Sequence, residues 1–94
     1  WNSRTQQGVL VVRNLPLAPA GKTYEFWVID PATAAPVSAG LLFTDSEGRA
    51  QLVFKPKANV TTAAQFAISI EPSGGSTQAG PTGPVVMAGS TTQL

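Results

Sequence analysis

Any chemistry in this chain would have to come from its carboxylates. The sequence contains no histidine and no cysteine, which removes Ser-His and Cys-His catalytic pairs and the usual zinc and copper ligands. Of the five acidic residues, Glu25 and Glu71 are the pair that falls within predicted strands. Glycosidase chemistry would need two such carboxyl groups roughly 5 to 10 Å apart across a cleft. We favour the simpler interpretation, in which both are surface residues on outward strand faces and the domain is not an enzyme.

The acidic stretch Asp45-Ser46-Glu47-Gly48 is a second candidate, because alternate acidic side chains can converge on a hard cation. A calcium loop normally supplies more oxygen ligands than these two carboxylates. We therefore expect a plain turn, in which Asp45 caps the turn with its own carboxylate and Gly48 takes the left-handed conformation. The sequence predicts no metal site and no cofactor.

The aromatic residues Tyr24, Phe26 and Trp27 could stack a sugar or a peptide if they were exposed. Aromatic residues in a strand are more often buried, and Trp27 is predicted to anchor the strand 24–29 as a core residue. An extracellular carbohydrate-binding or peptide-binding adhesion module, using Tyr24 and Trp27, is the alternative function that the sequence allows.

The charge balance argues against a nucleic-acid partner. Six cationic and five anionic residues leave a net charge of +1, without the clustered lysines and arginines that displace phosphate counterions. Hydrophobic residues make up 43% and charged residues 12% of the 94 residues, which suits one globular domain. No run approaches the about 18 apolar residues of a membrane-spanning helix, and residues 1–4 do not resemble a secretory signal.

Strands must position these side chains, since short apolar runs alternate with turn residues and no window keeps a helical period. The predicted fold is all-β, an antiparallel two-sheet β-sandwich, Ig-like, with about six to seven strands. Gly40 is expected to form a bulge and residues 44–48 a hairpin that pairs the strands on either side. The expected strands cover residues 9–13, 24–29, 37–43, 49–54, 65–71 and 85–88.

The sandwich is expected to span residues 8–89, between a polar N-terminal segment (1–7) that could add a short strand and a C-terminal tail (90–94). Residues 9–13 are apolar on both faces, which indicates a strand inside the sandwich. The strand over 65–71 alternates instead, with Phe66, Ile68 and Ile70 on one face. Its other face carries Gln65, Ala67, Ser69 and Glu71.

A glycine-rich and proline-rich segment follows that strand. Pro72 closes the strand because it lacks a backbone donor. Gly74 and Gly75 can take positive φ, so the chain can turn sharply there, while Pro81 and Pro84 stiffen the segment. The pattern favours a structured turn over a flexible tether.

Three motifs in order carry a resemblance to a known family. They are the strand 20–29 with Tyr24-x-x-Trp27, the segment 37–40, and the run 70–84 with Glu71-Pro72-Ser73-Gly74-Gly75 and Pro81-Thr82-Gly83-Pro84. From about Gly8 to Gly89 the chain resembles the C-terminal extracytoplasmic domain of the anti-sigma-K factor family. The motif residues, which we expect to be structural, are Tyr24, Trp27, Gly40, Gly48, Glu71, Pro72, Gly74, Gly75, Pro81, Thr82, Gly83 and Pro84.

The resemblance implies a parent protein with a cytoplasmic anti-sigma domain, one membrane-spanning helix and this domain on the extracytoplasmic face of the bacterial membrane, periplasmic or at the cell surface. The parent would hold an extracytoplasmic-function sigma factor through the cytoplasmic domain and release it after cleavage by a regulatory protease. This domain would be a sensory and regulatory module without catalysis of its own, and its ligand is unknown.

Overall fold

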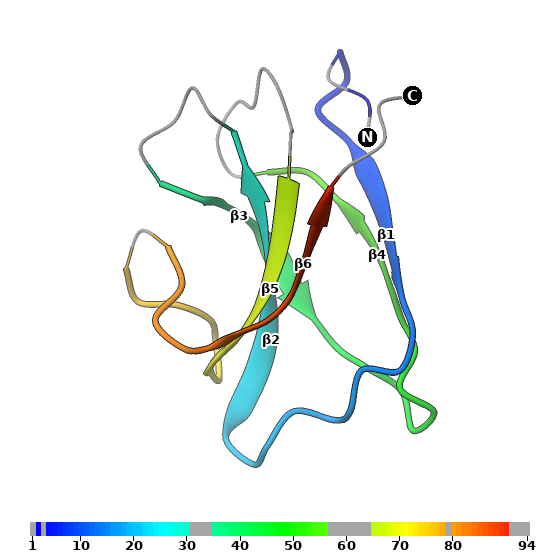
Figure 1. Ribbon diagram of the computed structural model, residues 1–94, viewed down its shortest axis with the longest axis vertical. Helices are drawn as coiled ribbons and strands as arrows, with labels where there is room; N and C mark the ends of the chain where they lie inside the picture. The colour runs from blue at the N-terminus through cyan, green and yellow to red at the C-terminus, as the bar shows by residue number, and fades with distance from the viewer. Residues whose placement is uncertain (1, 3, 31–34, 57–64, 79, 91–94) are drawn as a thin grey trace.

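The computed structural model describes residues 2, 4–30, 35–56, 65–78 and 80–90. These residues form strands and no helix, and hence no helix long and apolar enough to cross a membrane. Two antiparallel sheets face each other (Figure 1), which confirms the predicted all-β sandwich. One sheet pairs β1 (Gly8–Val12) with β4 (Ala50–Phe54), and the other has the order β3 (Val37–Leu42), β2 (Lys22–Ile29), β5 (Gln65–Pro72), β6 (Val85–Ser90).

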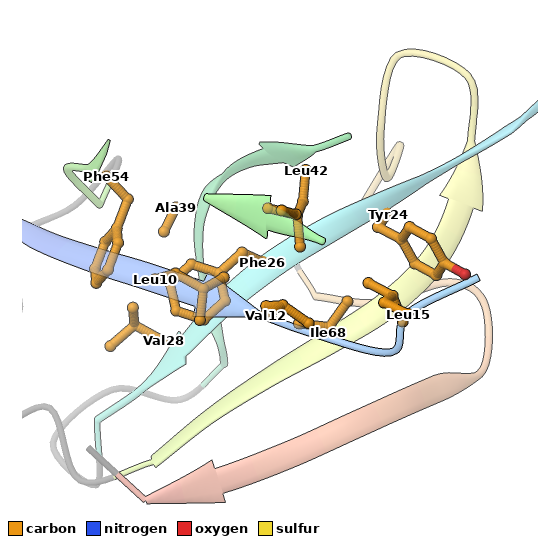
Figure 2. Packing of buried hydrophobic residues seen from close by; sticks show 11 residues of the cluster. Leu10, Val12, Leu15, Tyr24, Phe26, Val28, Ala39, Leu42, Phe54 and Ile68 are labelled. Atoms are coloured by element: carbon orange, nitrogen blue, oxygen red, sulfur yellow. The ribbon is translucent and has the colours of Figure 1, made fainter. Parts of the chain in front are cut away.

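The hydrophobic core lies between the two sheets and is centred on Phe26. Its ring meets the ring of Phe54 edge to face, with centroids 4.7 Å apart at 76°, so this pair joins β2 of one sheet to β4 of the other. Figure 2 shows the side chains that gather around this contact. Burying each large side chain contributes about 1.5 to 3 kcal/mol. The cluster comprises Leu10, Val12, Leu15, Tyr24, Phe26, Val28, Ala39, Leu42, Ala50, Phe54 and Ile68.

The strands β2 and β5 form the centre of the larger sheet and pair without interruption from Lys22 opposite Pro72 to Ile29 opposite Gln65. Because side chains alternate between faces, the even-numbered residues between the strand ends, Tyr24 to Val28 and Phe66 to Ile70, point into the core. The odd-numbered residues of both strands share the outer face, which carries Thr23 opposite Glu71, Glu25 opposite Ser69, and Trp27 opposite Ala67.

The expected bulge in β3 is present at Gly40. The register shifts between Phe26, which pairs with Gly40, and Trp27, which pairs with Ser38, so Ala39 is the extra residue. Gly40 has a φ of 122°, a conformation that favours glycine.

The predicted hairpin over 44–48 is wrong in its pairing. The strand that follows it, β4, pairs with β1 in the opposite sheet and not with β3. The turn therefore carries the chain from one sheet to the other. The sequence did not reveal this, because the alternation of apolar and polar residues within a strand does not specify which other strand it pairs with. The chemistry expected of the turn is confirmed, because Asp45 Oδ1 accepts the backbone N–H groups of Glu47 at 2.8 Å and Arg49 at 2.9 Å, and Gly48 has a φ of 76°.

The expectation that the first strand lies inside the sandwich is also wrong. In β1, Val12 is buried at 3% exposure, but its neighbour Val11 is 59% exposed. Val9 and Val53, which are opposite each other on the same outer face, are exposed as well. Among the described residues, the four-stranded sheet covers one face of the β1–β4 sheet. The apolar residues on its other face, such as Val9, Val11 and Val53, therefore point outwards.

The predicted N-terminal strand is represented by an isolated bridge, in which Asn2 N donates to Gln7 O at 2.8 Å. Residues 91–94 of the predicted tail lie outside the described residues. The proposed division into residues 1–7, 8–89 and 90–94 stays a prediction.

Candidate functional site

The outer face of β2 and β5 is the part of the molecule where polar side chains gather and are buried. Glu71 is 0% exposed and Glu25 is 4% exposed, so the expectation that they lie on the solvent-facing surface is wrong. Ser69 and Thr23, which share this face, are buried too. What covers Glu71 and Glu25 is the segment between β5 and β6, which folds back and donates hydrogen bonds to both carboxylates.

We call this segment the clasp; it comprises residues 73–84, of which 79 lies outside the described residues. Its second half binds Glu71. The backbone N–H of Thr82 lies 3.1 and 3.2 Å from the two carboxylate oxygens, and the N–H of Gly83 donates to Oε2 at 3.3 Å. The hydroxyl groups of Thr82 and Ser69 donate to Oε1 and Oε2 respectively.

Burial by itself would raise the pKa of Glu71, because it disfavours the charged form. The hydrogen bonds from Ser69, Thr82 and Gly83 outweigh burial, so the pKa of Glu71 lies below the ordinary value. Glu71 is therefore an ionised carboxylate inside the protein, held by hydrogen-bond donors.

The first half of the clasp is held by Glu25. The backbone N–H of Ser76 donates to Glu25 Oε1 at 2.7 Å, and the hydroxyl of Ser38 on β3 donates to Oε2 at 2.6 Å. Glu25 thus connects the clasp, β2 and β3.

A hydrogen-bond chain links the tryptophan to this network. Trp27 Nε1 donates to Ser69 Oγ at 2.9 Å, and Ser69 Oγ in turn donates to Glu71. Trp27 is buried, as predicted, but it lies on the outer face of the sheet and is not part of the cluster between the sheets. The indole, the serine and the carboxylate act as one polar unit beneath the clasp.

The glycines and prolines of the motif shape the clasp. Gly75 N donates to Pro72 O at 2.8 Å and Gly74 has a φ of 95°, which closes a turn that requires glycine at its third position. At the other end, Pro84 O accepts the N–H of Ile70 at 3.0 Å, and Pro81 O accepts the side-chain amide of Gln78 at 3.1 Å.

Close approach requires glycine at position 83, and it adds to the effect of the positive φ of 100° at Gly75. A Cβ on Gly83 would lie 1.8 Å from the carbonyl oxygen of Ile70, and one on Gly75 would lie 3.0 Å from Glu25 Oε1. The backbone of the clasp therefore passes close to both carboxylates, and the Thr82 hydroxyl adds a side-chain contact to Glu71.

The structure thus brings together the motif residues Trp27, Glu71, Pro72, Gly74, Gly75, Pro81, Thr82, Gly83 and Pro84. It leaves three others elsewhere: Gly40 in the β3 bulge, Gly48 in the turn between the sheets, and Tyr24 in the core.

This arrangement is closed to substrates. Both carboxylates are buried and have accepted hydrogen bonds from the protein itself, so they do not flank an open cleft as glycosidase chemistry requires. Tyr24 and Trp27 are buried and their polar atoms bonded, the Tyr24 hydroxyl to Pro16 O at 2.7 Å. The exposed aromatic platform of the adhesion alternative is contradicted.

The acidic turn also resembles no cation site. Arg49 Nε lies 3.3 Å from Asp45 Oδ2, and another guanidinium nitrogen lies 3.2 Å from Glu47 Oε2, so both carboxylates face a cation of the protein. Backbone hydrogen bonds from Arg49 and Glu47 are the main reason that the pKa of Asp45 is lowered. Among the described residues no group of three or more acidic side chains is placed to hold a metal ion.

Sequence reasoning missed Ser69, Ser38, Ser76 and Thr23 as parts of this site. One signal was available: Ser69 and Glu71 share a strand face and are followed by a segment rich in glycine, whose backbone N–H groups can approach closely.

Comparison with known protein families gives a match over most of the chain. Residues 1–85 match the model of a protein family described as anti-sigma-K factor rskA, C-terminal. No curated protein and no solved structure matches the chain significantly.

Proposed function

Because this chain belongs to the family of anti-sigma-K factor C-terminal domains, we propose that it is the extracytoplasmic regulatory domain of a membrane-anchored anti-sigma factor. The family indicates a regulatory role towards a sigma factor. In the proposal, the sigma factor binds a cytoplasmic domain of the parent protein and is released after regulated proteolysis. The match over most of the chain is the observation that carries this proposal.

The proposed role of this domain is to control access of the protease, without catalysis of its own. Closure of the polar site supports this, since Glu25 and Glu71 are occupied by donors from Ser76, Thr82 and Gly83. These contacts fix the clasp to the outer face of the sheet, which is a structural role.

Stability is the physical quantity that would convert a signal into cleavage. A protease needs an extended, accessible chain, so a folded sandwich next to the membrane would restrict cleavage and an opened one would permit it. A change of one or two kcal/mol alters the ratio of folded to unfolded molecules about 5-fold to 30-fold. A ligand or partner that binds one state preferentially would shift cleavage by the same linkage.

Two phenylalanine variants of the membrane-anchored parent protein test the proposal. Phe26→Ala opens a cavity in the core, where the side chain is 2% exposed, whereas Phe43→Ala removes the same ring from a position that is 74% exposed. We expect Phe26→Ala to increase both the cleaved membrane fragment on immunoblots and transcription from a sigma-dependent reporter. Phe43→Ala should resemble the wild type.

Cleavage that is equal in both variants and the wild type would exclude protease gating by this domain. Cleavage without any change in reporter output would exclude control of the sigma factor.

A further inference from the structure

The Glu71 carboxylate is surrounded by four hydrogen-bond donors of the protein. Two are the backbone N–H groups of Thr82 and Gly83, which cannot reverse their direction. A third is the Thr82 hydroxyl, and the fourth is the Ser69 hydroxyl, which already accepts a hydrogen bond from Trp27 Nε1. A proton added to the carboxylate finds an acceptor among these groups only if the Thr82 or Ser69 hydroxyl turns round, and the bonds that remain lose the charge that strengthens them, so the contacts favour the ionised form.

The groups facing Glu71 offer no compensating charge. On β2 the titratable side chain of this face is Glu25, and β5 contributes Ser69. The clasp contributes backbone N–H and hydroxyl groups, and β3 contributes the hydroxyl of Ser38 to Glu25. Ion pairs in the described residues involve Arg49 in the turn before β4, and none reaches Glu71 or Glu25.

The clasp is also separate from the hydrophobic core. The cluster between the sheets and the apolar residues packed against it contain no residue of 73–78 or 80–84. The described hydrogen bonds from the clasp to the rest of the protein are those to the two carboxylates and three backbone bonds near its ends: Ser73 N to Gly21 O at 3.1 Å, Gly75 N to Pro72 O at 2.8 Å and Ile70 N to Pro84 O at 3.0 Å. Opening the clasp would therefore leave the core packing in place.

From these contacts we infer that the clasp is an acid-sensitive latch, which protonation of Glu71 releases from the sheet while the two sheets stay packed. Release exposes the outer face of β5 and loosens the beginning of β6, because Pro84 carries the bond to Ile70 just before that strand. The inference goes beyond the proposed function and does not depend on it, since it concerns this chain alone.

Amide hydrogen exchange of the 94-residue chain, followed residue by residue by NMR, tests the inference. The reporters are the N–H groups of Ser76, Thr82 and Gly83 in the clasp and of Phe26 and Ile68 in the central strands. Protection factors are used because they correct for the intrinsic effect of pH on exchange. We expect clasp protection to fall about tenfold or more as the pH drops below the ordinary glutamate value of 4.5, while the strand amides stay protected.

Two variants sharpen the test. Glu71→Gln places a side-chain NH₂ group opposite the N–H and hydroxyl donors that face residue 71. The clasp amides of this variant should therefore exchange faster than those of the wild type already at neutral pH, and acid should change their exchange little. Glu47→Gln removes an exposed carboxylate from the turn of the other sheet and should exchange like the wild type in the clasp. Clasp amides that keep their protection in acid, or that lose it together with Phe26 and Ile68, would overturn the inference.

Discussion

The α-carbon of Gly83 lies directly against the carbonyl group of Ile70, so closely that a Cβ on residue 83 would be 1.8 Å from the carbonyl oxygen. Gly83 is not among the residues with positive φ, so this glycine is required for space and not for an unusual backbone conformation. The contact allows the N–H of Gly83 to reach the buried Glu71 carboxylate.

Replacing Gly83 with alanine should therefore displace the clasp. The clash is between two backbone segments, which cannot move apart without loss of the bonds to Glu71, and we expect a loss of about 3 kcal/mol or more in the free energy of unfolding. Gly74→Ala is the control, because a Cβ there meets open space and costs about 1 to 2 kcal/mol for its φ of 95°. Urea denaturation compares the two, and an equal loss would show that the close approach is unimportant.

Ser69 should be the polar side chain of the outer face that is most sensitive to truncation. Ser69→Ala removes the acceptor of the Trp27 indole N–H and one donor of Glu71, leaving buried groups unsatisfied at a cost of about 2 to 3 kcal/mol. Ser73→Ala, at an exposed position of the clasp, should change stability by less than about 0.5 kcal/mol. Denaturation followed by tryptophan fluorescence measures both, and a Ser69→Ala protein as stable as the control would refute the hydrogen-bond chain.

Replacing threonine with valine should have opposite effects on stability at positions 23 and 82. The buried Thr23 hydroxyl has no hydrogen-bond partner, so Thr23→Val should leave stability unchanged or raise it by about 1 kcal/mol. Thr82→Val removes the hydroxyl that donates to Glu71 and should cost about 1 to 3 kcal/mol. Thermal unfolding compares the two variants, and a Thr23→Val protein less stable than Thr82→Val would contradict the hydrogen bonding of these two hydroxyl groups.

The two valines at the end of β1, Val11 and Val12, provide a test of its position at the surface. Val12→Ala removes methyl groups from the core and should cost about 1 to 3 kcal/mol, whereas Val11→Ala should cost less than about 0.5 kcal/mol. Equal costs in chemical denaturation would mean that the outer face of β1 is covered in solution.

Stability should decrease in acid, and the sign follows from the lowered pKa values of Glu71 and Asp45. A carboxylate with a depressed pKa stabilises the folded state above its unfolded value, here 4.5 for glutamate and 3.8 for aspartate, and this contribution is lost as the pH falls through the folded pKa. Urea unfolding between about pH 7 and pH 3 should therefore show a decline that begins below about pH 5.

Asp45→Asn separates the two contributions. The amide oxygen can still accept the two backbone N–H groups of the turn, so the fold should survive with a small loss, because the side chain is exposed. Its decline at the lowest pH should be shallower than that of the wild type, while the part due to Glu71 persists. A steeper decline in the variant would mean that ionised Asp45 does not stabilise the folded state.

Much of the local structure could be predicted from single residues. Alternation located all six strands within two residues at each end, Gly40 indicated a bulge, and Asp45 and Gly48 indicated the turn that they form. These features depend on the backbone preferences of a few neighbouring residues, and those preferences follow from the residue types alone. Trp27 could likewise be predicted to be buried, but the hydrogen bond to Ser69 could not, because residues 42 positions apart make it.

The sequence by itself therefore determined the strands, the turns and the family to which this chain belongs. Tertiary structure alone decided that β4 leaves its sequence neighbour and pairs with β1, and that the polar face of β5 is buried. The physical reason is the same in both cases. Alternation reports that a strand has two different faces, but what covers each face depends on which distant segment returns to it. For Glu71 that segment is the clasp, whose glycines admit a close backbone approach and whose N–H groups make burial of a charge possible.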